Sequence, residues 1–179
     1  MQKIYIEKDL KTTPYYNPSE RIKLEILPVN GRLVNGNQYK MYSLIKRIFV
    51  ISADMKIYHL SSIRMFSLHH SSPVAGEDVI FAGNVKFRAG KIISIDNSSG
   101  HYIPNEIHFF NALNYLNSLG VLSEKVQISI TERSANNPLV LIGNYGDFIS
   151  FFKNKYPNLF KTHLCLKIYA SPYLQHSKI

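Results

Sequence analysis

The clearest indication of the architecture is the run Val79-Ile80-Phe81-Ala82-Gly83-Asn84-Val85-Lys86-Phe87-Arg88-Ala89-Gly90-Lys91-Ile92-Ile93-Ser94-Ile95. Two apolar-rich segments, residues 79–87 and 91–95, flank a short loop, which is the pattern of a β-hairpin. Gly90 can supply the positive φ that such a loop needs. The run therefore predicts two antiparallel strands joined by a tight turn.

A second hairpin is predicted upstream. Residues 47–52 form a nearly continuous apolar run typical of a central strand, residues 53–55 a turn, and residues 56–60 the returning strand. Apolar and polar side chains alternate over residues 21–29, which indicates a half-buried strand. Further strands are predicted at residues 64–68, 125–131, 138–142 and 164–169.

Two helices are predicted in the second half of the chain. Apolar residues recur at helical spacing from Ile107 to Leu119, with Pro104 near the first turn and Gly120 at the C-terminal cap. A second helix, residues 147–156, ends before Pro157. The predicted fold class is α+β, with a mostly antiparallel sheet and about two helices packed on one side. The 179 residues indicate a single domain, 1–179, with an N-terminal arm at 1–20 and a motif-bearing core at 47–120.

Composition narrows the classes of partner. The formal net charge is +9, and the basic surplus lies in residues 1–47 and 153–179, which favours an acidic partner surface or simple solubility. The basic residues are scattered rather than set along one stripe with aromatic residues, so nucleic acid is not expected as a partner. Cys165 is the only cysteine, which excludes an intrachain disulfide and a CxxC metal site, and no metal is predicted. No stretch is long and apolar enough for a membrane span. The protein is expected to be a monomer.

Residues with chemical potential concentrate between 68 and 104. The run Leu68-His69-His70-Ser71-Ser72-Pro73-Val74-Ala75-Gly76 is followed by Ala82-Gly83, Gly90 and Ser99-Gly100-His101-Tyr102-Ile103-Pro104. Since Pro73 removes a ladder donor, residues 69–72 are placed at a strand end, with His70 and Ser72 on one face and His69 and Ser71 on the other. The second half leads into a helix N-terminus, whose free N–H groups form a natural anion site. The pattern predicts a binding site for a phosphorylated ligand, in which Arg64 or Arg88 would pair with a diphosphate group of that ligand.

Two other interpretations of the same residues stay open. Serine at a strand end often bonds its own backbone, and Tyr102 is equally consistent with a core ring whose hydroxyl is satisfied. No HExxH, GxSxG, GxGxxG or Walker motif is present. A hydrolase that uses Ser71 or Ser72 with a distant histidine remains an alternative.

The spacing of these residues resembles a known signature. His70-Ser71-Ser72, Ala75-Gly76, Ala82-Gly83, Gly90, Ile95, Ser99-Gly100-His101-Tyr102 and Pro104 fall in register with the HSS…SGHYxP domain of plant IQM proteins, a family of IQ-motif, calmodulin-binding proteins. The resemblance covers roughly residues 47–120, and Leu68, Pro73 and Asn84 depart from the family's pattern. Calmodulin binding is not carried over, because the IQ helix is missing from this sequence.

The same domain is similar to one in bacterial effectors, including a Chromobacterium-type family that ADP-ribosylates a threonine of ubiquitin. This resemblance implies an ADP-ribosyltransferase-like fold and an NAD-dependent protein mono-ADP-ribosyltransferase, with NAD as substrate and a host protein, ubiquitin first, as acceptor. It further implies a toxin or virulence effector secreted without a signal peptide into the host cytosol, or otherwise a cytoplasmic protein. The implied catalytic residues are His70, His101 and Tyr102. The implied NAD-binding residues are Arg64, His69, Ser71, Ser72, Gly76, Ser99 and Gly100. The alternative is a non-catalytic protein- or ligand-binding module built on the same surface.

Overall fold

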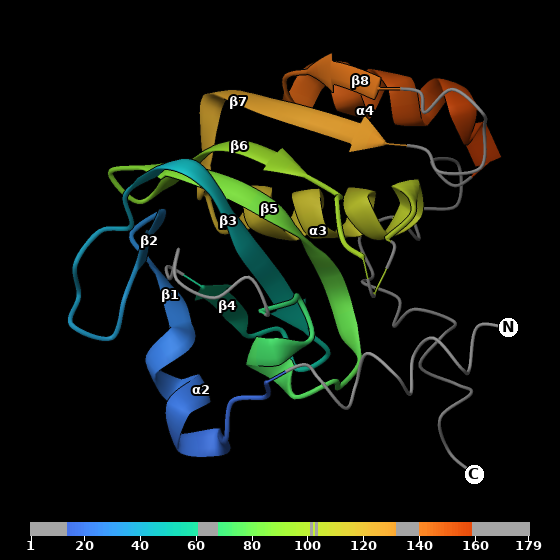
Figure 1. Cartoon of the computed structure of the whole chain (residues 1–179). Helices are drawn as coiled ribbons and strands as arrows, with labels where there is room; N and C mark the ends of the chain where they lie inside the picture. Colours follow the sequence, from blue (N-terminus) through green and yellow to red (C-terminus); the bar gives the residue numbers. More distant parts are fainter. Residues whose placement is uncertain (1–13, 61–67, 101, 103, 132–139, 159–179) are drawn as a thin grey trace, which may run out of the picture.

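Strands dominate the first half of the chain, and the two longer helices, α3 and α4, follow in the second half (Figure 1). The computed structural model describes residues 14–60, 68–100, 102, 104–131 and 140–158. The elements are α2 (Pro18–Leu24), β1 (Glu25–Val29), β2 (Arg32–Val34), β3 (Ser43–Ser52), β4 (Ile57–Leu60), the 3-10 helix η1 (Ser72–Val74), β5 (Val79–Arg88), β6 (Lys91–Asp96), α3 (Glu106–Ser118), β7 (Leu122–Thr131), β8 (Val140–Gly143) and α4 (Tyr145–Lys155). The predicted α+β class is confirmed.

One sheet links the eight described strands in the order β2-β1-β4-β3-β5-β6-β7-β8. Neighbouring strands are antiparallel except β6 and β7, which are parallel. The exception follows from the connection, because a crossover through α3 returns the chain to the same end of the sheet. Both predicted hairpins are present, as β3–β4 and β5–β6. The turn of the second has φ +49° at Ala89 and +80° at Gly90.

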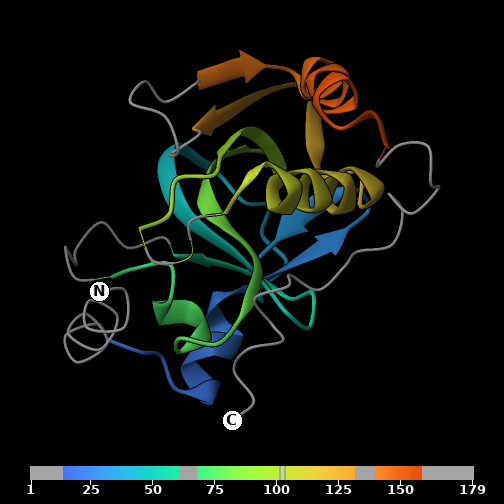
Figure 2. The same ribbon diagram turned by 90° about the vertical axis from the view of Figure 1, so that its right-hand side faces the viewer.

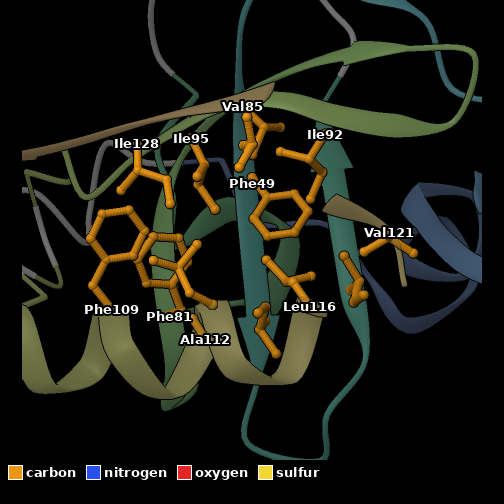
Figure 3. Packing of buried hydrophobic residues seen from close by; sticks show 14 of the residues in the cluster. Phe49, Phe81, Val85, Ile92, Ile95, Phe109, Ala112, Leu116, Val121 and Ile128 are labelled. Atoms are coloured by element: carbon orange, nitrogen blue, oxygen red, sulfur yellow. The ribbon is translucent and has the colours of Figure 1, made fainter. Parts of the chain in front are cut away.

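The main core lies between the sheet and the helices α3 and α4, which share one face as predicted. Aromatic rings dominate it: Phe81 stacks on Phe109 with ring centroids 5.0 Å apart, and Phe110 stacks on Phe152 at 3.9 Å. Figure 3 shows strand side chains such as Phe49 and Phe81 pointing toward Leu116 and Phe109 of α3. This apolar burial is the principal stabilising contribution to the fold.

A smaller cluster covers the opposite face of the sheet. Val50, Tyr58, Val74 and Ala82 are buried there, and Leu24 and Tyr102 are among the residues packed against them. The cluster exists because successive strand residues point to opposite faces, so Val50 turns away from the main core. In Figure 2, α2 (blue) and η1 (green) lie together below the sheet, away from α3 and α4. The predicted phosphate-binding motif thus lies on the face that carries the smaller cluster.

The N-terminal prediction needs a correction. Residues 21–24 were expected in a strand, yet they complete α2, and β1 starts at Glu25. The helix begins because Asn17 caps it: its side chain accepts a hydrogen bond from the Glu20 N–H, the Glu20 carboxylate accepts one from the Asn17 N–H, and Pro18 supplies a preset φ. These capping contacts outweigh the alternation of polar and apolar residues.

Parts of the sequence-based description fall outside the described residues. They include most of the predicted arm, residues 1–13, and the predicted strands at 64–67 and 164–169. The other predicted elements appear: residues 125–131 lie in β7, 140–142 in β8 and 147–155 in α4. Among the described residues, no helix has the length and apolar character needed to cross a membrane.

Candidate functional site

Residues 69–76 form a compact turn around η1 rather than the end of a strand. Ser71 has right-handed helical backbone angles (φ −76°, ψ −19°), and Ala75 has a left-handed φ of +51°. The Ser72 hydroxyl accepts a hydrogen bond from the His69 N–H at 3.0 Å, and the fixed φ of Pro73 suits the short helix. The predicted alternation of faces from His69 to Ser72 is therefore wrong, because it requires extended backbone.

The two serines of this turn are shielded from solvent. The exposed fraction is 5% for Ser71 and 0% for Ser72. The Ser72 carbonyl also accepts a hydrogen bond from the Tyr16 N–H at 3.2 Å, which ties the turn to the residues before α2. A buried hydroxyl held by backbone is poorly placed to attack a substrate, so the hydrolase alternative gains no support.

His70 fastens the turn to the sheet. Its Nε2 lies 2.9 Å from the Gly83 carbonyl oxygen in β5. Glycine is required at position 83, since a Cβ there would overlap the Asp96 carbonyl oxygen in β6. The HSS and Ala-Gly parts of the signature are therefore in contact with each other, because His70 of the first part binds the backbone carbonyl of Gly83 in the second part.

The second half of the signature is tied down in the same way. The Ser99 hydroxyl accepts a hydrogen bond from the Tyr102 N–H at 3.3 Å, and the Tyr102 hydroxyl donates one to the Glu77 carbonyl at 2.6 Å. Burial raises the pKa of Tyr102 well above its ordinary value. The ring packs against the smaller cluster, which matches the core interpretation. Gly100 is exposed, whereas His101 and Arg64 lie outside the described residues.

The predicted anion site at the start of α3 is occupied by a side chain of the chain itself. Asn105 caps the helix, and its Oδ1 accepts hydrogen bonds from the N–H groups of Ile107 and His108, each at 3.0 Å. The N–H groups expected to be free are therefore satisfied internally. Pro104 precedes this cap rather than lying in the first turn, because the capping asparagine defines where the helix begins.

A buried carboxylate that the sequence did not single out organises the end of β6. Asp96 is 4% exposed, and its Oδ1 accepts hydrogen bonds from Asn84 Nδ2 at 2.9 Å and the Ser98 N–H at 3.0 Å. Its Oδ2 lies 2.7 Å from Lys46 Nζ. Asn84, which binds Asp96, departs from the family's pattern. That departure was the one feature of the sequence that could have pointed to the hydrogen bonds around Asp96.

An open groove of about 630 Å³ lies beside the turn. Two ion pairs border it: Arg21 Nη2 is 2.7 Å from Glu77 Oε1, and Lys56 Nζ is 3.1 Å from Asp54 Oδ2. A hydrogen bond from the Ser52 hydroxyl lowers the pKa of Asp54. The lining residues come from α2, the β3–β4 hairpin and residues 74–78: Arg21, Ser52, Ala53, Asp54, Lys56, Tyr58, Val74, Gly76, Glu77 and Asp78.

Sequence reasoning missed this groove, because its walls come from three separated segments. Within the part of the chain that the structure describes, Gly76 is the one predicted site residue in the lining. The same described part contains no group of three or more His, Cys, Asp or Glu residues that could hold a metal ion. No observation tests NAD binding, which stays a prediction.

Comparison with known proteins gives a family. The model of the "IQ motif-containing protein middle domain" matches residues 20–109, which is half of the chain. The "IQ domain-containing protein IQM4" of Arabidopsis thaliana is 30% identical over 105 residues, covering 57% of this chain and 20% of the plant protein. The plant's "IQ domain-containing protein IQM3" is 29% identical over 120 residues, covering 64% of this chain and 26% of the relative. The chain thus spans about a fifth to a quarter of these relatives.

These findings correct the predicted activity. The matches are to IQ-domain proteins and not to transferases, so the prediction of an NAD-dependent ADP-ribosyltransferase acting as a toxin or effector is wrong. The inferred link to a bacterial effector family and ubiquitin has no support. No solved structure matches the chain, so the ADP-ribosyltransferase-like fold is not confirmed.

The predicted resemblance to plant IQM proteins is confirmed. The family match begins in α2 and ends in α3, and so it contains the whole signature from His70 to Pro104. Inside it, the histidine, serine and tyrosine groups that the structure describes hold the turn at η1 to the sheet. The chain belongs to the family of the IQ motif-containing protein middle domain.

Proposed function

We propose that this chain is a non-catalytic protein-binding module whose ligand lies in the groove between α2, the β3–β4 hairpin and residues 74–78. The observation that carries the proposal is the use of the signature's polar groups. His70 binds the Gly83 carbonyl, Ser72 binds backbone next to it, and Tyr102 binds the Glu77 carbonyl. Because these side chains bind backbone atoms, they hold residues 74–78 in place, and these residues form one side of the groove.

The lining suits a polypeptide segment. Val74 and Tyr58 offer apolar surface, while the Arg21–Glu77 and Asp54–Lys56 pairs provide donors and acceptors along the rim. Interfaces commonly combine an apolar centre with a polar rim of this kind. The family membership agrees with a binding role, and an IQ-domain family makes calmodulin one partner to include in a test.

A photocrosslinking experiment tests the proposal on the full chain. A benzophenone amino acid replaces Ala53, which is exposed and lines the groove, and in a matched control it replaces Asn117, which is exposed at the end of α3. Each protein is irradiated in an extract of the source organism and, separately, with purified calmodulin with and without Ca²⁺. We expect a discrete protein adduct from position 53 and none from position 117, and we expect Glu77→Lys to remove the adduct by breaking the Arg21 pair.

Two results would overturn the proposal. Equal adducts from both positions would show that the groove is not the binding surface. Intact-mass spectrometry in the presence of NAD supplies the second: a gain of one ADP-ribose on any protein, abolished by His70→Ala, would restore an enzymatic role.

A further inference from the structure

The start of β3 contains a bulge that turns apolar side chains outward. Ser43 pairs with Phe87, and Arg47 pairs with Val85, so the three residues from 44 to 46 stand opposite one residue of β5. The Ser43 hydroxyl donates a hydrogen bond to the Ile45 carbonyl at 3.0 Å and accepts one from Arg47 Nε at 3.2 Å. The bulge is therefore a bonded conformation, and bulges of this kind re-aim side chains.

The residues at and before the bulge expose a large apolar surface. The exposed fractions are 70% for Tyr39, 65% for Tyr42, 47% for Leu44 and 51% for Ile45. Single exposed apolar residues are ordinary, whereas four within seven positions are unusual and call for an explanation. We call these four residues the 39–45 patch.

The segments that carry the 39–45 patch and the turn beside it are rich in basic residues. The β5–β6 turn lies beside it, since the Gly90 N–H donates a hydrogen bond to the Met41 carbonyl at 2.8 Å. Residues 30–47 and 84–96, all of them described, contain seven basic residues and one acid, Asp96, so their surplus is 7 − 1 = 6 of the chain's net +9. Asp96 is itself paired with Lys46. The basic residues are Arg32, Lys40, Lys46, Arg47, Lys86, Arg88 and Lys91.

The 39–45 patch is separate from the groove. Figure 1 shows the start of β3 and the β5–β6 turn at the upper left, whereas η1 and α2 lie at the bottom of the view. Residues 39–45 contribute nothing to the groove lining, all of which is described. The inference below therefore does not depend on the proposed function.

We propose that the 39–45 patch is a docking surface for an acidic protein segment that carries large apolar side chains. The exposed Leu44 and Ile45 provide contacts that an apolar anchor would bury, and the flanking cations attract and orient carboxylates. A single-stranded nucleic acid would also meet positive charge, and Tyr39 and Tyr42 are exposed rings on which bases could stack. Leu44 and Ile45 are aliphatic and about half exposed, and an apolar side chain of a protein segment would bury them, so the proposal is a protein partner.

The test uses the full chain and a phage-displayed library of random dodecapeptides. Selection is run in parallel on the wild type and on the double variant Leu44→Ser/Ile45→Ser, whose substituted side chains are half exposed, so that folding is retained and is checked by the thermal midpoint. We expect peptides rich in Asp, Glu, Leu and Phe to be enriched on the wild type. The winning peptide, measured by fluorescence anisotropy, should bind the double variant about tenfold more weakly or worse, which corresponds to 1.4 kcal/mol.

Matched controls separate this surface from others. Ile22→Ser removes an apolar side chain that is 70% exposed on α2, outside the 39–45 patch, and should leave binding unchanged. Glu77→Gln, in the groove, should also leave it unchanged, so failure here and failure of the proposed function are distinguishable. Arg88→Glu should weaken binding severalfold and reduce its salt dependence.

Three outcomes would overturn the inference. The first is a peptide consensus without acidic residues. The second is equal enrichment on the wild type and the double variant. The third is an oligouridylate that binds more tightly than the peptide and loses affinity with Arg88→Glu but not with Leu44→Ser/Ile45→Ser, which would assign the surface to nucleic acid.

Discussion

Mild acid should weaken this fold through one buried imidazole. His59 in β4 is 6% exposed, and its ring meets Phe87 edge-on with centroids 5.2 Å apart. Among the described residues, its Nε2 has no hydrogen-bond partner. Burial, together with the positive charge of Arg47, lowers the pKa of His59 from 6.5 to about 4. The folded protein therefore holds this ring neutral at a pH where the unfolded chain protonates it.

The direction and the size of this loss of folding stability follow from the difference between the pKa values of His59 in the folded and unfolded states. As the pH falls below 6.5 the unfolded state takes up a proton first, so stability is complete above that pH and is lost on the way down to about 4. The difference of 6.5 − 4 = 2.5 pKa units, at about 1.36 kcal/mol each, gives a total of about 3.4 kcal/mol. About 2 kcal/mol of this is lost between pH 7 and pH 5, where most carboxylates remain ionised.

Urea unfolding of the wild type and His59→Leu at pH 7 and pH 5 measures the effect. The wild type should lose about 2 kcal/mol more than the variant over this interval, since leucine cannot titrate. His108→Gln is the control: burial also lowers the pKa of His108, but this residue is partly exposed, and glutamine can keep the helix-capping contact. Parallel pH dependences for the wild type and His59→Leu would refute the reasoning.

Three further changes test packing, capping and charge. Gly83→Ala should cost about 3 kcal/mol in urea unfolding, because the new Cβ overlaps a carbonyl of β6, whereas Gly100→Ala, with no atom within 4 Å, should change stability by less than about 0.5 kcal/mol; equal effects would contradict the assigned close approach. Asn105→Ala removes the cap of α3 and should cost about 1 kcal/mol, measured by thermal unfolding, and an unchanged midpoint would argue against that cap. Lys155→Met leaves the carboxylate of Glu106, which is 5% exposed, without its ion pair and should cost about 2 kcal/mol in urea unfolding, and this loss should disappear when Glu106→Leu is also present.

The strands and the two longer helices could be predicted from the sequence because their signals are local. The apolar run at 47–52 and the Gly90 turn identify both hairpins, and the spacing from Ile107 to Leu119 identifies α3. The expected alternation at 21–29 failed at its first four residues, because Asn17 and Glu20 start a helix whose capping bonds outweigh that pattern.

The site was less predictable, because its contacts join distant residues and backbone atoms. Nothing in the local pattern around His70 says that its partner is the Gly83 carbonyl, thirteen residues away. The groove combines Arg21 with Glu77, which are 56 residues apart in the chain. The resemblance implied a catalytic histidine and tyrosine, whereas the hydrogen bonds described for the side chains of His70 and Tyr102 are with backbone oxygens.

The two unequal cores give this domain two levels of resistance to opening. The larger one spans the sheet, α3 and α4, while the smaller contains four fully packed residues under η1 and α2. Free energies of local opening scale with the apolar contacts that must be broken, so the smaller side separates at a lower free energy than the sheet. Amide protons of Tyr16 and Ala75, which bond to Ser72 carbonyl oxygen, should exchange with deuterium well before those in the middle of β5. We therefore expect the wall of the groove to open locally and close again while the rest of the protein stays folded.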